Sequence, residues 1–72
     1  MATKRFVPYI EYVTKNDFYI NLWDDDDTMY PEMWRQHFIW YTVTEARNII
    51  RERLKEKYPN TKIILAHNIE QH

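Results

Sequence analysis

Glycine, cysteine and serine are all absent from this chain of 72 residues. Without cysteine the chain can form neither disulfides nor cysteine-based zinc sites, and without serine it also lacks the second common thiol or hydroxyl nucleophile. Without glycine it cannot build the Gly-rich loops that bind nucleotide phosphates. Any backbone position with positive φ must then hold another residue, most readily Asn or Asp. These absences favour a protein that is not an enzyme and carries no cofactor.

Long apolar segments are absent too. No segment approaches the roughly 20 apolar residues that a membrane-spanning helix needs. No hydrophobic segment follows the basic start MATKRF, as it would in a signal peptide. We therefore expect a cytoplasmic protein without a membrane partner. The length predicts one small domain, residues 1–72, and such a domain buries only about 60% of the surface that its unfolded chain exposes.

The chain is rich in aromatic side chains, which make up 17% of its residues, and its charge is unevenly distributed. Seven acidic residues and one basic residue lie between Glu11 and Glu32. Seven basic and three acidic residues lie between Arg35 and Lys62. Such an asymmetry bears on the choice of partner rather than on the fold.

Two segments of alternating character, residues 6–13 (FVPYIEYV) and 18–23 (FYINLW), predict a β-hairpin. A three-residue turn over 14–16 would place Asn16 in the left-handed conformation that usually requires glycine. Pro8 cannot donate to a ladder, which indicates that its side of the first strand is an edge or a strand start.

This turn sets Ile10 opposite Ile20 and Tyr12 opposite Phe18, and a slip by one residue would mix the two faces of the hairpin. The predicted core face carries Ile10, Tyr12, Phe18, Ile20 and Leu22. The predicted opposite face carries Val7, Tyr9, Glu11, Val13, Tyr19, Asn21 and Trp23.

A third strand is expected over 35–42 (RQHFIWYT). Its alternation places Phe38 and Trp40 on one face and the set His37, Ile39 and Tyr41 on the other. The pattern alone leaves open which of the two sets faces the core.

The segment 42–60 predicts a helix, because Thr42 and Glu45 form a capping box at its start. Apolar residues recur at helical spacing and form one stripe: Val43, Ala46, Ile49, Ile50, Leu54 and Tyr58. Pro59 prevents continuation, and Asn60 can take the left-handed conformation at the end.

The segment 62–70 (KIILAHNIE) reads as a strand that is apolar on both faces, which favours a central position. The element order is then β-β-β-α-β. It predicts a two-layer α+β fold in which one helix covers one face of a largely antiparallel sheet.

One helix leaves the other face of such a sheet uncovered. That face would carry Val7, Tyr9, Val13, Tyr19 and Trp23, with one of the two sets from the third strand. Large apolar patches often mark interaction surfaces, and Tyr and Trp are enriched at binding hot spots. The rings could simply shield the sheet, form a homodimer, or bind another protein or a nucleic acid.

The run Asp24, Asp25, Asp26 and Asp27 does not fit a calcium loop. Counted from Asp24, the required glycine is Met29 and the closing glutamate is Arg35. We therefore expect no metal there, but either a solvated loop or an acidic patch that meets a basic partner. His37, His67 and His72 show no metal-ligand spacing either, although a facing pair of His37 and His67 is conceivable.

Arg47, Arg51 and Lys55 stand four residues apart and form a basic stripe on the predicted helix. Such a stripe can bind phosphates, so nucleic acid is the alternative partner. The net charge of −1 makes this partner less favourable than a protein.

The order strand–TVTEA–helix–YPNTKI–strand, over roughly residues 36–66, is similar to that of small phage proteins that inhibit a host machine such as RNA polymerase. The resemblance implies a compact sheet-and-helix domain that docks on a target, and it transfers no functional residue. Taken together, the sequence predicts a small regulator, adaptor or inhibitor that binds another protein. We expect the contact to use Tyr9, Tyr19, Trp23 and the acidic run.

Overall fold

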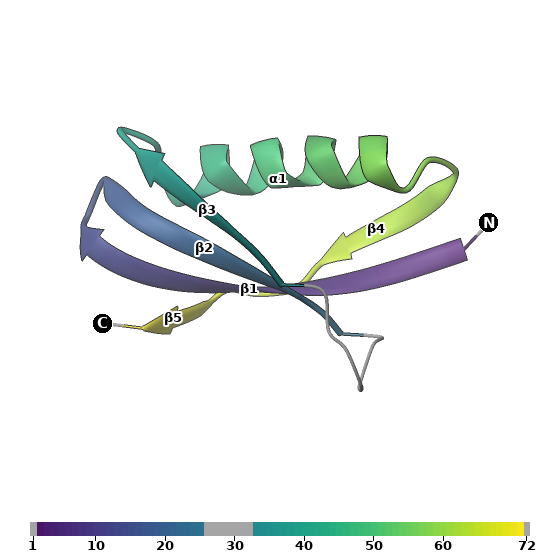
Figure 1. Cartoon of the computed structure of the whole chain (residues 1–72), viewed down its shortest axis with the longest axis horizontal. Coiled ribbons are helices and arrows are strands. Elements are labelled where there is room, and N and C mark those ends of the chain that lie inside the picture. The colour runs from purple at the N-terminus through teal and green to yellow at the C-terminus, as the bar shows by residue number, and fades with distance from the viewer. Residues whose placement is uncertain (1, 26–32, 72) are drawn as a thin grey trace.

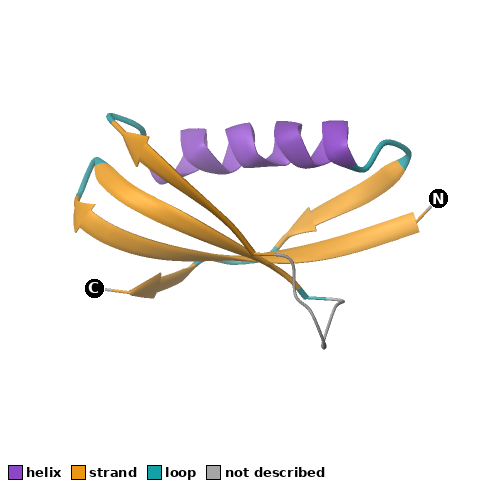
Figure 2. Ribbon diagram, viewed as in Figure 1, coloured by secondary structure: helices purple, strands orange, loops and turns teal. Residues whose placement is uncertain are grey.

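The computed structural model describes residues 2–25 and 33–71 and shows one helix on one side of a five-stranded sheet (Figures 1 and 2). The elements are β1 (Ala2–Thr14), β2 (Asp17–Asp24), β3 (Met33–Ile39), α1 (Val43–Lys57), β4 (Thr61–Leu65) and β5 (Ile69–Gln71). The predicted two-layer α+β fold is confirmed. Within the described ranges, no helix has the length and apolar character needed to cross a membrane.

The long strand β1 is the centre of the sheet. β2 pairs antiparallel with one edge of β1, and β3 pairs antiparallel with the far edge of β2. Along its other edge β1 pairs in parallel with both β4 and β5. The prediction of one central last strand is therefore wrong. The segment forms two short strands, and both lie outside β1 in the sheet.

Pro8 lies where the last strand is interrupted. β4 ends opposite Phe6 and β5 begins opposite Tyr9, so the gap between them faces Val7 and Pro8. Because proline has no backbone N–H to donate, a ladder is not easily continued at this point. Pro8 itself is buried in the central strand. The prediction that its side of β1 is an edge or a strand start is therefore wrong, and Pro8 instead lies beside the gap between β4 and β5.

The hairpin has the predicted register, with Ile10 paired to Ile20 and Tyr12 to Phe18. Its turn is different, because Thr14 pairs with Asp17 and leaves only two residues between the strands. The register shifts between Tyr12 and Thr14, and this irregularity in β1 takes up the extra residue.

The expected left-handed conformation of Asn16 is consequently wrong. Among the described residues, positive φ occurs at Trp40 (66°) and Asn60 (63°). The backbone oxygen of Asn16 instead accepts a hydrogen bond from the N–H of Trp40, with the two atoms 2.7 Å apart. This bond ties the hairpin turn to the end of β3.

The helix begins as predicted. The Thr42 hydroxyl accepts a hydrogen bond from the Glu45 N–H, while the Glu45 carboxylate accepts one from the Thr42 N–H. Its apolar stripe faces the sheet, with Ala46, Ile50 and Leu54 buried. The left-handed conformation predicted for Asn60 is confirmed.

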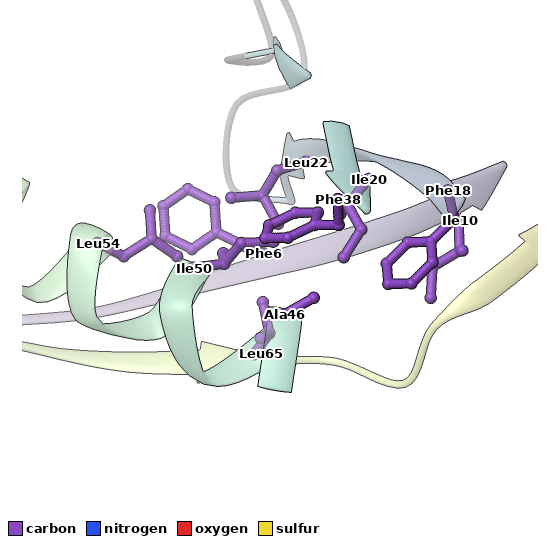
Figure 3. Close-up of a cluster of buried hydrophobic side chains, with 10 residues drawn as sticks. All are labelled: Phe6, Ile10, Phe18, Ile20, Leu22, Phe38, Ala46, Ile50, Leu54 and Leu65. Atoms are coloured by element: carbon purple, nitrogen blue, oxygen red, sulfur yellow. The ribbon is translucent and has the colours of Figure 1, made fainter. Parts of the chain in front are cut away.

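The core lies between α1 and the sheet (Figure 3). It consists of Phe6, Ile10, Phe18, Ile20, Leu22, Phe38, Ala46, Ile50, Leu54 and Leu65. Phe18 and Phe38 stack with their ring centroids 5.8 Å apart, so the third strand turns Phe38 toward the helix. The prediction that Trp40 shares this face with Phe38 is wrong. β3 ends at Ile39, and the positive φ of Trp40 turns the chain out of the sheet before the helix begins.

Candidate functional site: the open face of the sheet

The side of the sheet opposite α1 is covered by no described helix or strand (Figure 2). We call it the open face. By strand alternation and register it carries Arg5, Val7, Tyr9, Glu11, Asp17, Tyr19, Asn21, Trp23, Arg35, His37, Ile39, Lys62, Ile64 and Ile69. The third strand therefore contributes the set that contains His37 and Ile39.

One part of the open face is apolar. Val7 pairs with Trp23 across β1 and β2, and Tyr9 pairs with Ile69 across β1 and β5. The rings of Tyr9 and Trp23 meet edge to face, with centroids 5.8 Å apart, and both side chains are half-buried. Ile69 is 43% exposed. These side chains and Ile64 form what we call the apolar zone: Val7, Tyr9, Trp23, Ile64 and Ile69.

The other part, over β2 and β3 and Glu11 of β1, holds an ion pair and a hydrogen-bonded His–Asp pair around a single ring. His37 stacks on Tyr19 with centroids 4.3 Å apart, and the Arg35 guanidinium lies 4.2 Å from the centre of the same ring. Arg35 also donates to the Glu11 carboxylate at 3.1 Å, and His37 Nε2 lies 2.5 Å from the Asp17 carboxylate. We call these five residues the paired-charge zone.

The structure thus brings together two of the three predicted ring residues, Tyr9 and Trp23. Tyr19 lies on the same face but in the paired-charge zone, held between Arg35 and His37. The predicted contact surface is therefore a face with an apolar part and a polar part, rather than a uniform aromatic patch.

Asp24 does not belong to the predicted acidic loop. It is the last residue of β2, faces the helix side of the sheet and is only 6% exposed. Its carboxylate lies 2.8 Å from Lys4 Nζ, and hydrogen bonding to Asp24 raises the pKa of Lys4 above its ordinary value. Lys4 Nζ also lies 4.3 Å from the centre of the Tyr58 ring. Asp24 is therefore a structural residue, because the register of β1 and β2 places it in the same row as Phe6.

Asp25 is the exposed acid of the run. It lies in the turn after β2, and its carboxylate is 3.6 Å from the guanidinium of Arg5 at the margin of the open face. Asp26 and Asp27, which were also predicted to contact a partner, lie outside the described residues.

The basic stripe on α1 is altered by Arg47. Its guanidinium donates to the backbone oxygens of Leu65 at 3.0 Å and Ala66 at 2.8 Å, and to Asn68 Oδ1 at 2.6 Å. Burial, with a smaller effect from the charge of Arg51, lowers the pKa of Arg47. Arg47 is thus occupied in fixing the link between β4 and β5.

The rest of the predicted basic stripe is weaker than expected. Arg51 is half-buried, and Lys55 Nζ lies 3.5 Å from the Glu52 carboxylate. The stripe is on α1, which lies on the side of the sheet opposite to the open face (Figure 2), so one nucleic-acid strand could not readily contact both.

The conceivable pair of His37 and His67 is excluded by topology. His37 lies in β3 and His67 follows β4, at opposite edges of the sheet. Across residues 2–25 and 33–71, no three histidine or carboxylate side chains come together in a way that could hold a metal ion.

Trp40 is the surface residue that the sequence pattern misplaced. Its side chain is 85% exposed and lies at the hairpin end, beside a notch of about 140 Å³ lined by Thr14, Asn16, Asp17, Ile39 and Trp40. The sequence contains a signal that the strand ends before Trp40. The capping box at Thr42 leaves only two residues after β3 in which the chain can leave the sheet and enter the helix.

Comparison with known proteins found no matching family model, no matching curated protein and no matching solved structure.

Proposed function

We propose that this protein is a non-enzymatic interaction module that binds a protein partner through the open face, with the apolar zone at the centre of the contact. The observation that carries the proposal is the Tyr9–Trp23 pair, flanked by exposed Ile64 and Ile69, on a face that no described element covers. An exposed apolar cluster with a charged surround is the usual composition of a protein–protein interface.

The ring pair suits this role energetically. Tyr and Trp are the residues most often found at binding hot spots. Here the two rings already support each other within one sheet, so little side-chain freedom remains to be lost when a partner binds. Rigid strands also hold the side chains more firmly than a loop would.

The charges around the apolar zone favour a protein over nucleic acid. Among the described residues, the open face carries the basic side chains of Arg5, Arg35 and Lys62 and the carboxylates of Glu11 and Asp17, with the Asp25 carboxylate at its margin. Nucleic-acid affinity depends on an excess of cations that neutralise phosphates. On the helix, Arg47, the first residue of the basic stripe, already donates to backbone oxygens.

The test is a binding experiment with the tagged chain as bait in its native source. Trp23→Ala should abolish capture of the partner that the unmodified chain retains. Trp40→Ala is the matched control, because it removes an even more exposed indole that lies off the open face, and it should leave capture unchanged. Circular dichroism should show both variants folded.

A second variant guards against loss of packing in Trp23→Ala. Ile64→Asp adds a charge at an exposed site of the apolar zone without removing either ring, and it should also abolish capture. Retention of the partner by both open-face variants would refute the proposal. Loss of binding only in Arg51→Glu and Lys55→Glu, with a steep dependence on salt, would favour a nucleic-acid partner instead.

A further inference from the structure

We infer that the partner covering the open face is a second copy of this chain, packed sheet against sheet across a two-fold axis. This inference rests on the proposed function, since it assigns the occupant of the same surface. Three features of the described residues support it: the balance of charge, the position of the apolar zone and the size of the face.

The charges of the open face complement themselves. In a two-fold interface the same patch meets its own copy, so a face with one sign of charge would repel its partner. Among the described residues, the open face and its margin instead hold three basic and three acidic side chains, and Arg35 already pairs with Glu11 and Arg5 with Asp25. All four of these side chains are exposed, so a facing copy could share them without first breaking a buried pair.

The apolar zone lies over β1, β4 and β5 and includes Trp23 of β2, whereas the paired-charge zone lies over β2 and β3 and includes Glu11 of β1. A two-fold axis through the apolar zone, near Tyr9 and Ile69, would stack one apolar zone on the other. It would direct the paired-charge zones outward to the rim. This arrangement gives an apolar core with a polar rim, which is the anatomy of stable interfaces.

The face is also large enough. The five strands contain 36 residues together. At about 3.3 Å per residue and about 4.8 Å between strands, the face covers on the order of 570 Å². Two such faces give on the order of 1,100 Å², which exceeds the roughly 1,000 Å² that a specific interface needs.

The hairpin end around Trp40 is much narrower than the open face, which argues against it as the main contact between copies. Sheets that pack face to face lie about 10 Å apart, a spacing that interdigitated Tyr, Trp and Ile side chains fill. The dimer would then be a four-layer particle with α1 on both outer surfaces.

The experiment is sedimentation equilibrium of the purified full chain from micromolar to millimolar concentration. We expect a reversible transition from the 9.1 kDa monomer to a species of twice that mass. Ile69→Asp should raise the dimer Kd by roughly 100-fold or more, because near the axis the two introduced carboxylates approach each other. Ile69 is exposed in the monomer, so this substitution should leave the fold intact, as circular dichroism would verify. Trp40→Ala, the control at the hairpin end, should leave Kd unchanged.

Two results would overturn the inference: a monomer at every concentration, or a dimer that Trp40→Ala weakens and Ile69→Asp does not. If the chain is monomeric but its open-face variants still lose the partner from the native source, the second copy is refuted and the proposed function stands. If neither self-association nor partner capture responds to the open-face variants, both are refuted.

Discussion

Replacing Arg47 with methionine is a direct test of whether this arginine serves the fold or a ligand. The change keeps an unbranched side chain of good helix propensity and removes only the guanidinium. That group donates to three acceptors, at 2.6–3.0 Å, on the last residue of β4 and on the segment that joins β4 to β5. Without it, the oxygens of Leu65 and Ala66 lose their charged donor at the place where the strand leaves the core.

The expected cost follows from these bonds. A hydrogen bond to a charged group contributes about 1.5–3 kcal/mol, but the three share one donor group and water can reach part of the site. We therefore expect Arg47→Met to lower the free energy of unfolding by about 2–4 kcal/mol. For a domain of this size that is a large part of a total of about 5–10 kcal/mol.

Urea denaturation monitored by circular dichroism measures this loss as a lower midpoint with an unchanged slope. Arg51→Met is the matched control, since it makes the same chemical change one turn further along α1, at a half-buried arginine. We expect Arg51→Met to change the free energy of unfolding by no more than about 0.5 kcal/mol. The charge of Arg51 is slightly unfavourable to that of Arg47, so its removal should not weaken the Arg47 hydrogen bonds. Equal effects of the two substitutions would refute the structural assignment of Arg47.

Two further predictions concern Lys4 and Trp40. Because hydrogen bonding to Asp24 raises the pKa of Lys4 above 10.5, the stability that this pair contributes is fully present below pH 10.5 and is lost as the pH rises through the folded-state value. Urea midpoints measured from neutral to strongly alkaline pH should fall less steeply for Lys4→Met than for the unmodified chain, and parallel curves would contradict the assignment. Trp40→Gly should raise the free energy of unfolding by about 0.5–1 kcal/mol, since a bulky residue with φ of 66° carries a conformational cost that glycine avoids and its exposed ring packs little. A lower melting temperature for this variant would show that the indole supports the fold.

The hairpin and the helix could be read from the sequence because their signals are local. A slip by one residue would separate Ile10 from Phe18 and Ile20, so alternation together with the short turn determines the pairing of β1 and β2. The capping box at Thr42 and the apolar stripe of α1 likewise lie within one segment. Pro59 and Asn60 mark its end in the same way.

The position of the last strand could not be read in this way. The apolar residues at 63–65 are equally consistent with a central strand and with an outer strand lying partly under α1. What decides between them is that β1 is long enough to pair with three strands, and this depends on contacts between distant parts of the chain. Pro8 interrupts the neighbouring strand rather than its own, and its position in the sequence does not indicate which strand pairs there.

The candidate site shows the same division. Alternation predicted correctly that Tyr9, Tyr19 and Trp23 share the open face. Asp24 continues the alternation of the core residues Ile20 and Leu22, but its charge and the acids that follow it suggested a loop. Only the register with β1 brings Lys4 close enough to neutralise it. Arg47 could be placed beside the apolar stripe, whereas its acceptors, 18 to 21 residues further along the chain, could not.

The central place of β1 has a consequence for the order in which the domain assembles. Its antiparallel side joins neighbouring segments, whereas its parallel side joins Ala2 with Thr61 and so closes a loop of nearly the whole chain. Short loops close at lower entropic cost and sooner than long ones. We therefore expect the meander of β1, β2 and β3 to form before β4 and β5 pair with the other edge of β1. β4 and β5, which follow the helix in the chain, complete the core and replace the long edge of β1 with two short edges, on which strands of other chains pair less readily.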